Sequence, residues 1–532
     1  MPRRPARPAR ILGLSAAALA ALLALAGCYN GGSPFFGPRE TPATATPTPS
    51  SGPFAAYFDQ VVDWRACDAG FECATIAAPL DWEDESDERS LDIAVIRHRA
   101  SSTDRLGTLF VNPGGPGASG VDFVRDYDFW FVSPEIVERY DIVGWDPRGA
   151  GRTAPVTCYT DPDDISDFLY GVPTVDPQAD PEGWVDEQLA AGADYAQACL
   201  AGSGESLEFV DTLSTVRDLE LMRALSGDPV LNYLGYSYGT AIGAIYVDEY
   251  PERVGRAVLD GVMDRESDLA TLAISQQAGF ERALTNFVRG CPAFSDCPLS
   301  GDPTVDLPRI HAVLEQFEAS PVSGGTAAAG RAMTGQSLST GMLQALYSES
   351  LWPALSTLLS EVLRPVPVTE TAWQLADMYN DFTPGVGLGS NIQDALWAIY
   401  CVDYPVELDP ARLADQQARL AEAAPTLTLD LPAMPDPVCS QWPFEYRGGQ
   451  HDRLTGAGAA PVLIISTTGD PATPYEEGVK LSEDLDSGVL VSFEGEGHTA
   501  YSRYGDQCIV DAVDGYLLRG VVPSDGTWCE SF

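Results

Sequence analysis

One serine lies between two tyrosines and two glycines in the stretch Gly235-Tyr236-Ser237-Tyr238-Gly239. The apolar residues before it are typical of a strand, and the small and apolar residues after it are typical of a helix. In the strand-to-helix turn called a nucleophile elbow, a serine adopts strained backbone angles and the flanking glycines let strand and helix pack closely. We therefore predict that Ser237 is a nucleophile, although an ordinary glycine-rich turn has the same pattern.

A serine that attacks a carbonyl carbon needs a base to take its proton and an acid to orient that base. Two later strand-like runs end in suitable residues, residues 461–470 in Asp470 and residues 488–498 in His498. The carboxyl ends of parallel strands meet at one edge of a sheet, and serine, aspartate and histidine follow here in the order that α/β-hydrolases use. We predict that His498 transfers the proton and that Asp470 orients its imidazole.

Only four histidines are present, so few other bases are available. We interpret His98 as a strand residue, His311 as a residue on a helix face and His451 as a loop residue, and each stays an alternative base. Only His498 follows a strand near the end of the chain.

Backbone N–H groups are expected to bind the oxyanion, because they are fixed before the charge develops. One normally belongs to the residue after the nucleophile, here Tyr238. The second is predicted in the glycine-rich loop Asn112–Gly120, at Gly115 or alternatively at Gly114. A tight turn without a ligand is the other interpretation of this loop.

Strand-like runs that are rich in Val, Ile and Leu alternate with helix-like segments, which favours an α/β fold with a mostly parallel central sheet. These runs are residues 91–99, 107–115, 140–149, 230–237, 256–262, 461–470 and 488–498. Between them, residues 265–455 show helical patterns and Pro- and Gly-rich turns. We predict a helical cap at 265–455, inserted between a first core segment, 54–264, and a C-terminal core segment, 456–532.

The N-terminus has the features of a signal peptide: a basic start and sixteen uncharged, mostly apolar residues from Ile11 to Ala26. It ends in Leu-Ala-Gly-Cys, which resembles a bacterial lipobox and predicts cleavage after residue 27 and a lipid on Cys28. Plain secretion is the alternative. Residues 28–53 are rich in Gly, Thr and Pro and are predicted to be a flexible tether.

The formal charge is −46, and removal of residues 1–27 with their four arginines makes it −50. Such a charge repels nucleic acid and anionic lipid headgroups, so any membrane attachment is expected through the lipid alone. The charge could attract cationic substrates, but we favour the interpretation that it keeps the protein soluble in a harsh or salty exterior.

Eleven cysteines are present, and ten remain if Cys28 is lipidated. An even number in an exported chain predicts disulfides, and we expect neighbours in the sequence to pair in order. CxxC pairs, interleaved histidines and phosphate-binding loops are not found, so no metal or other cofactor is predicted. The ten cysteines are Cys67, Cys73, Cys158, Cys199, Cys291, Cys297, Cys401, Cys439, Cys508 and Cys529.

Five ordered motifs resemble the tripeptidyl aminopeptidases of actinobacteria, which are relatives of the proline iminopeptidases with the α/β-hydrolase fold. They are NPGGPG, DIVGWDPRGAGRTAP, GYSYGT, STTGDPATP and GEGHTAY, and the similarity covers most of residues 60–532. The resemblance places the nucleophile, acid and base on Ser237, Asp470 and His498, and the glycine loop on Gly114–Gly117. Proline iminopeptidases have a histidine where this loop begins with Asn112-Pro113, so a strict proline preference does not follow. Asp146 and Arg148 also match, and we interpret them as an ion pair that braces a loop.

The resemblance implies release of short peptides, three residues long, from the free N-terminus of oligopeptides through an acyl-enzyme intermediate. An aminopeptidase must bind a protonated amine, so a carboxylate is expected near the serine. We predict Asp403 for this role because it follows an apolar helix, with Asp377 and Asp381 as weaker alternatives. Cap tryptophans either line a peptide cleft or pack between helices, namely Trp352, Trp373 and Trp397.

Two other functions use the same sequence features. An exported carboxylesterase or lipase-like hydrolase would use the same triad and oxyanion loop, but would not need a free amine on its substrate. A non-catalytic surface binder could keep the fold, but it would have no need of all three triad residues. An epoxide hydrolase is disfavoured, because its elbow would carry an aspartate where this chain has Ser237.

Overall fold

A computed structural model describes residues 52, 54–126, 129–448 and 453–530. The chain divides into two compact units, Met1–Thr46 and Pro47–Phe532, and all described residues lie in the second. The predicted signal peptide, Cys28 and nearly all of the tether therefore lie outside the described residues, as does His451.

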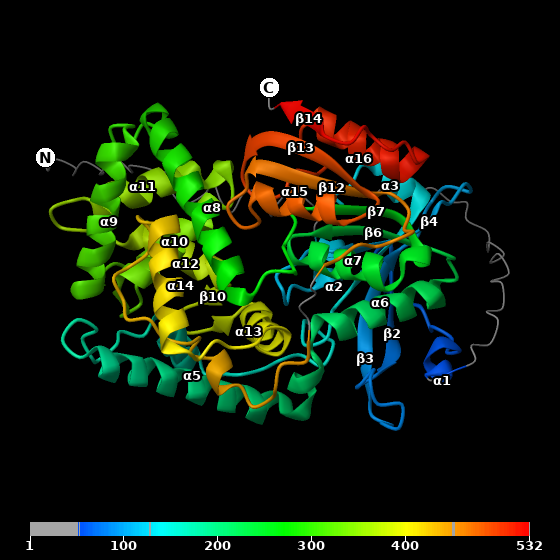
Figure 1. Cartoon of the computed structure of the whole chain (residues 1–532), viewed down its shortest axis with the longest axis horizontal. Coiled ribbons are helices and arrows are strands. Elements are labelled where there is room, and N and C mark those ends of the chain that lie inside the picture. The colour runs from blue at the N-terminus through cyan, green and yellow to red at the C-terminus, as the bar shows by residue number, and fades with distance from the viewer. Residues whose placement is uncertain (1–51, 53, 127–128, 449–452, 531–532) are drawn as a thin grey trace, which may run out of the picture. The chain divides into compact units, whose positions relative to one another are not determined.

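A ten-stranded sheet forms the centre of the second unit (Figure 1). The first strands along its edge, up to β5, pair antiparallel, and every pair from β5 to β14 is parallel. In spatial order the strands are β1 (Arg65–Asp68), β2 (Phe71–Pro79), β3 (Ser90–His98), β5 (Tyr140–Trp145), β4 (Gly107–Asn112), β6 (Leu231–Tyr236), β7 (Val254–Asp260), β12 (Val462–Gly469), β13 (Gly488–Glu496) and β14 (Thr527–Glu530). The predicted mostly parallel sheet is thus confirmed.

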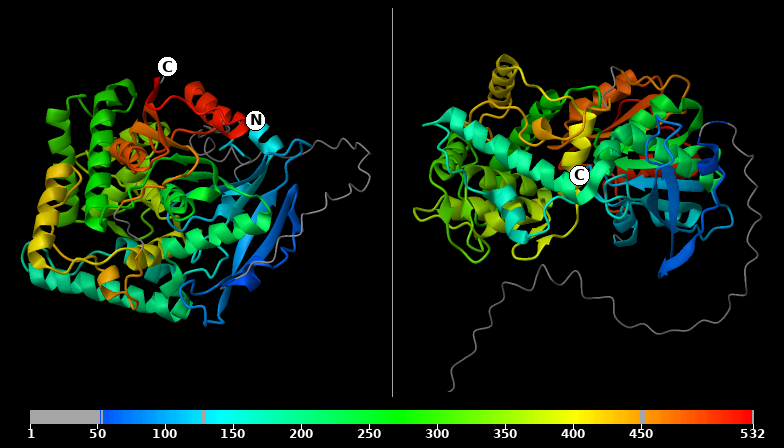
Figure 2. Two further views of the ribbon diagram at one scale, coloured as in Figure 1. Left: turned by 45° about the vertical axis from the view of Figure 1, so that its right-hand side comes forward. Right: turned by 90° about the horizontal axis from the view of Figure 1, so that it is seen from below.

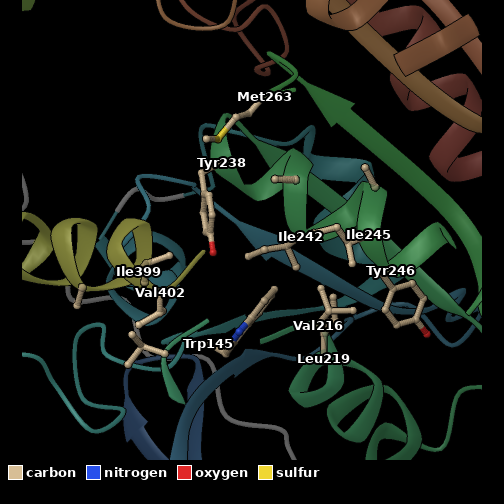
Figure 3. Packing of buried hydrophobic residues seen from close by; sticks show 14 of the residues in the cluster. Trp145, Val216, Leu219, Tyr238, Ile242, Ile245, Tyr246, Met263, Ile399 and Val402 are labelled. Carbon is tan, nitrogen blue, oxygen red and sulfur yellow. The ribbon is translucent and has the colours of Figure 1, made fainter. Parts of the chain in front are cut away.

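Helices cover both faces of this sheet, which explains the continuous apolar runs of its central strands. Every residue of β4 and β6 is buried. On one face the sheet packs with α6 (Thr212–Ser226), α7 (Tyr238–Glu249) and α15 (Tyr475–Asp484). On the other it packs with α2 (Gly120–Asp126), α3 (Pro134–Arg139) and α16 (Gln507–Arg519). Figure 3 shows the first cluster, in which Val216 and Leu219 of α6 face Ile242 and Ile245 of α7.

Between β7 and β12 the chain is mostly helical, as the sequence indicates (Figure 1). Several of these helices begin at an aspartate that caps exposed backbone N–H groups, such as Asp268 before α8. The helices are α8 (Leu269–Gly290), α9 (Pro303–Ala319), α10 (Gly335–Leu346), α11 (Trp352–Val362), α12 (Glu370–Tyr379), α13 (Ile392–Asp403) and α14 (Pro410–Ala423). The expectation that this region holds no strands needs a small correction. The two-residue strands β8 (Val322–Ser323) and β9 (Ala332–Met333) pair, as do β10 (Phe382–Thr383) and β11 (Gly387–Leu388).

Some helices pack across the segment boundaries proposed from the sequence. Helix α4 (Pro162–Tyr170) lies before the predicted cap, yet its Ile165 and Tyr170 belong to the apolar cluster of the cap helices. Helix α5 (Pro181–Ser203) runs beneath the same helical region (Figures 1 and 2). Helix α13 lies within the predicted cap, but its Ile399 and Val402 pack in the cluster of the central sheet.

Five disulfides join the ten cysteines in sequence order, so the predicted pairing is confirmed. The pairs are Cys67–Cys73, Cys158–Cys199, Cys291–Cys297, Cys401–Cys439 and Cys508–Cys529. Disulfides of this number are typical of exported proteins. Among the described residues, no helix has the length and apolar character needed to cross a membrane.

Candidate active site

Ser237 lies at the sharp turn between β6 and α7, with φ 55° and ψ −127°. A β-carbon on Gly235 would lie 2.5 Å from the carbonyl oxygen of Gly239, and one on Gly239 would lie 2.7 Å from the carbonyl oxygen of Asn112. Strand and helix therefore approach too closely at this turn for larger residues. The backbone strain at Ser237 is the strain expected of a nucleophile elbow.

Asp470 and His498 are in direct hydrogen-bond contact. The Nδ1 atom of His498 is 2.9 Å from each carboxylate oxygen of Asp470, whose side chain is fully buried. Three backbone N–H groups also donate to this carboxylate, those of Ala472, Thr473 and Thr499. The Thr473 hydroxyl adds a bond of 3.0 Å. These bonds hold the carboxylate rigidly. An ionised carboxylate can only accept hydrogen bonds, so Nδ1 of His498 must carry a proton and Nε2 is left as the basic atom.

The end of β7 connects the serine to the histidine. The backbone N–H of Ser237 donates to the carbonyl of Asp260 at 3.0 Å. A β-carbon on the next residue, Gly261, would lie 3.2 Å from Cε1 of His498. The ends of β6, β7, β12 and β13 therefore meet at one place, and the side chains of all three predicted triad residues come from this edge.

Asp260 is a fully buried carboxylate that the sequence analysis missed. It accepts backbone N–H bonds from Ala500, at 3.0 and 3.1 Å, and from Tyr501, at 2.7 Å, so it ties the loop after His498 to β7. Burial raises the pKa of Asp260 to about 7, although the N–H groups of Tyr501 and Ala500 oppose the shift. Its position at the end of a strand next to the elbow is the signal that could have identified it.

The charge of Asp470 controls the titration of His498. Burial by itself would lower the pKa of His498, but the negative charge of Asp470 and the hydrogen bond to it outweigh burial. The pKa of His498 therefore lies above its usual range. A base of this kind holds a proton more readily as the serine attacks, and it must lose that proton before each new cycle.

The glycine loop packs directly on the elbow. A β-carbon on Gly114 would lie 2.6 Å from the carbonyl oxygen of Tyr236 and 3.0 Å from the backbone nitrogen of Tyr238. Gly114 and Gly115 have φ values of 95° and 110°, which favour glycine. Among the described residues, no acceptor is found for the N–H groups of Gly115 and Tyr238, and Tyr238 opens a helix, where such groups are unpaired. The arrangement suits an oxyanion site.

The predicted role of Asp403 needs correction. Its carboxylate is fully buried and forms an ion pair of 3.1 Å with Arg265, whose side chain is also fully buried. The backbone N–H and the hydroxyl of Thr212 donate to the same carboxylate. Because its charge is already matched and it has no exposed surface, Asp403 cannot receive the amine of a substrate. The sequence could not show this, since Arg265 lies 138 positions away.

The weaker candidates also have other roles. Asp377 pairs with Arg331 through two bonds of 2.6 and 2.8 Å, and Asp381 accepts a bond of 2.7 Å from the Ser390 hydroxyl. Two of the three tryptophans, Trp352 and Trp373, are buried between cap helices and so pack, as the alternative interpretation proposed. Trp397 packs against the cluster of the central sheet.

Tyrosines of the cap approach the histidine, and the sequence analysis missed them. The Tyr347 ring lies edge-on to the His498 ring, with 5.7 Å between centroids, and its carbonyl accepts the backbone N–H of His498 at 2.9 Å. Tyr379 lies next to Tyr347, 6.2 Å between centroids. The two rings come from different cap segments, so only the tertiary structure brings them to the base.

The two alternative bases that the structure describes lie in regular elements, as predicted. His98 lies in β3 and His311 in α9, where its Nδ1 is 3.1 Å from the carbonyl of Thr426. Asp146 and Arg148 do not pair with each other. Arg148 is buried and pairs with Asp218 at 2.6 Å, and Asp146 pairs with Arg152 at 3.1 Å. Within the described part of the chain, no group of three or more side chains could hold a metal ion.

The sheet order, the helices on both faces and the elbow define the α/β-hydrolase fold, a class of hydrolytic enzymes. Residues 424–529 match the family model described as "TAP-like protein". The chain is 34% identical over 488 residues to "Serine protease Hip1" of Mycobacterium tuberculosis, covering 88% of this chain and 91% of that protein. It is also 34% identical over 522 residues to "Carboxylesterase B" of the same species, covering 95% and 97% of the two chains. "Tripeptidyl aminopeptidase" of Streptomyces lividans is 29% identical over 486 residues, covering 88% and 86%. The chain therefore belongs to the tripeptidyl aminopeptidase-like family of α/β-hydrolases.

Proposed function

We propose that this protein is a serine peptidase that releases short peptides, three residues long, from the free N-terminus of oligopeptides. Ser237 attacks the scissile carbonyl, and His498 takes the serine proton through Nε2. The oxyanion is bound by the N–H groups of Tyr238 and Gly115. His498 then donates its proton to the leaving amine. In the second half of the cycle water attacks the acyl-enzyme, His498 takes the proton of the water, and that proton returns to Ser237 as the peptide product leaves.

The observation that carries this proposal is the meeting of four strand ends at one edge. There a strained serine, a histidine bound to a buried carboxylate and two N–H groups that find no acceptor among the described residues lie together. A surface that only binds a partner does not need a histidine bound to a buried carboxylate that four further donors hold in place. Two relatives whose names denote peptidases support the choice of a peptide substrate.

A free amino end requires a carboxylate other than Asp403, and we propose Glu496. It lies two residues before His498, and its Oε1 accepts a bond of 2.8 Å from Asn286. Its Oε2 is buried and makes no hydrogen bond among the described residues. Burial raises the pKa of Glu496, although the hydrogen bond from Asn286 and the charge of Arg282 oppose the shift. Unlike Asp403, Glu496 is only partly buried as a residue, and a substrate ammonium group at Oε2 would supply the donor that this oxygen lacks among the described residues.

An esterase is the second candidate, because a relative that matches 95% of this chain is named a carboxylesterase. Esters and amides react through the same tetrahedral intermediate, so the triad and oxyanion site serve both. The two functions differ in their requirement for a substrate amine.

We further propose that the protein acts outside the cell. The five disulfides support export. Cleavage after residue 27 and lipidation of Cys28 would anchor it to the membrane, with residues 28–53 as the tether. The segments 54–264, 265–455 and 456–532 remain our proposed core, cap and C-terminal core.

The test uses the purified protein and a matched set of chromogenic amides with one, two or three residues, each with a free or an acetylated amino end, and a short-chain ester. Ser237→Ala should abolish turnover, whereas Ser226→Ala, at the end of α6, should not change it. We expect amide cleavage to require the free amine and to be fastest with three residues. Turnover of the ester alone would favour the esterase, and equal rates with acetylated and free amides would reject the aminopeptidase.

A further inference from the structure

A fully buried chain of polar groups connects the residue after the nucleophile to the ion pair of Asp403 and Arg265. The Thr212 hydroxyl donates to Asp403, and its oxygen is 2.6 Å from the hydroxyl of Tyr238. Because a hydroxyl has one proton, Thr212 must accept from Tyr238. The donors therefore run in one direction, from Tyr238 through Thr212 to Asp403, whose charge Arg265 balances. None of these side-chain groups takes part in the proton transfers described above.

The carboxylate end of this chain is held in place from several sides. Arg265 also donates to the Tyr404 hydroxyl at 2.6 Å. Asp403 is the last residue of α13, and the Cys401–Cys439 disulfide ties this helix to a distant segment. Figure 3 shows Tyr238 reaching from α7 toward the helix that carries Ile399 and Val402. The hydroxyl of Tyr238 is thus bonded to groups that are themselves held in place.

The other end of α13 contacts the glycine loop. A β-carbon on Gly117 would lie 2.6 Å from the carbonyl oxygen of Ile392 and 2.9 Å from the β-carbon of Ala395. One helix is therefore linked to both segments that supply the proposed oxyanion donors. Its start contacts the Gly114–Gly117 loop directly, and its end is joined to Tyr238 through Asp403 and Thr212.

We propose that Asp403, with Arg265 and Thr212, is a positioning residue that fixes Tyr238 and thereby aims its backbone N–H at the oxyanion. The inference rests on the proposed function of Ser237. An oxyanion donor is effective only when it is fixed before the charge develops. A buried ion pair adds little stability compared with apolar residues of the same size, so its value here is the geometry that it imposes on Tyr238.

The decisive variant is Tyr238→Phe, which keeps the ring and the backbone N–H and removes only the hydroxyl that is bound to Thr212. The matched control is Tyr246→Phe on the same helix, which removes a hydroxyl that is 2.7 Å from Glu220, two turns away from the elbow. Each variant loses one hydrogen bond of a tyrosine hydroxyl, a buried one in Tyr238→Phe and a partly buried one in Tyr246→Phe, so both melting temperatures should fall. Only Tyr238→Phe should lower kcat, by about tenfold for ester and amide substrates alike, with KM changed less than twofold.

Thr212→Val supplies a second test, since it breaks the chain at its middle with little change in volume. It should reproduce the loss in kcat, and Thr212→Ser, which keeps the hydroxyl, should restore it. Equal kcat in Tyr238→Phe and Tyr246→Phe, or a Thr212→Val enzyme with the kcat of the wild type, overturns the positioning role.

Ser237→Ala is measured in the same series to separate the two proposals. If it is inactive while Tyr238→Phe is fully active, only the positioning role fails. If it retains activity, the proposed function fails and the positioning role fails with it. A loss of kcat in Tyr238→Phe with no requirement for a free amine supports the positioning role and rejects the aminopeptidase.

Discussion

Replacement of Asp470 by asparagine tests the proposed acid, because the structure determines how the new amide must sit. Oδ1 of Asp470 accepts the backbone N–H groups of Ala472 and Thr473, at 2.9 Å each. Oδ2 accepts the N–H of Thr499 at 3.1 Å and the hydroxyl of Thr473 at 3.0 Å. An amide has only one oxygen, so its NH₂ group will take the Oδ2 position. The hydrogen bond from the N–H of Thr499 is then lost, and the Thr473 hydroxyl can turn to accept from the NH₂ group.

This orientation places a donor beside Nδ1 of His498 and favours the tautomer with the proton on Nε2, which cannot act as the base. In a serine protease triad, the same change costs about 10⁴-fold in kcat, which corresponds to about 5.4 kcal/mol of transition-state stabilisation. The unpaired N–H of Thr499 should lower the free energy of unfolding by about 1–3 kcal/mol. Loss of the Asp470 charge should also lower the pKa of His498, because that charge raises it in the wild type.

The assay measures kcat for a chromogenic ester and a tripeptide amide, with active sites counted by a fluorophosphonate, across a range of pH. The control is Asp525→Asn, an exposed carboxylate that accepts one backbone N–H, from Leu490 at 2.9 Å, and its kcat should stay within twofold of the wild type. A loss of less than tenfold in Asp470→Asn would refute the reasoning. Asp260, which holds the loop after His498, would then be the carboxylate to replace next.

Three further predictions follow from other carboxylates and from one buried arginine. Glu496→Gln should raise KM about tenfold or more for amides with a free amino end and leave acetylated substrates unchanged, with Glu494→Gln on the same strand as the control; an equal effect on both substrates would reject Glu496 as the amine site. Burial raises the pKa of Glu477 from 4.5 to about 8, so the stability that this group contributes is complete below about pH 4.5 and is lost as the pH rises through 8. Between pH 5 and 8 the Glu477→Gln variant should therefore lose less stability than the wild type, and the difference between the two losses should not exceed about 5 kcal/mol. If the urea midpoints of wild type and variant change in parallel over this range, the raised pKa of Glu477 is contradicted. Arg148→Met leaves the charge of Asp218 unpaired and should lower the free energy of unfolding, measured in urea, by about 3–5 kcal/mol. The double variant Arg148→Met/Asp218→Leu should recover most of this loss. If the single variant is as stable as the wild type, the pair is not buried in solution.

Sequence patterns predicted the centre of the sheet better than its edges. The strands β4 and β6 are buried on both faces, so each is a continuous apolar run that stands out in the sequence. The edge strands β1 and β14 are only four residues long and largely exposed, and neither was predicted. Partial burial leaves no clear alternation of apolar and polar residues to detect.

The same distinction separates the parts of the site. Ser237, Asp470 and His498 could be proposed from the sequence because each lies at the end of a strand, within a motif that local backbone geometry requires. The role of Asp403 could not be judged in this way. A carboxylate can bind a substrate only if its oxygens are not already occupied by residues of the protein. Here the residues that occupy them, Arg265 and Thr212, lie far from Asp403 in the chain.

By itself, the sequence determined the fold class and the order of the central strands, because strand and helix patterns are local features. The pairing of the cysteines in sequence order was a prediction, and the structure confirmed it. Only the tertiary structure decided which charges are matched, which helix supports the elbow and which tyrosines reach the histidine. Those contacts join α13 to α6 and the end of β7, and Tyr347 to His498. Burial and pairing of a side chain depend on how distant segments pack together, and for that reason a local sequence pattern does not predict them.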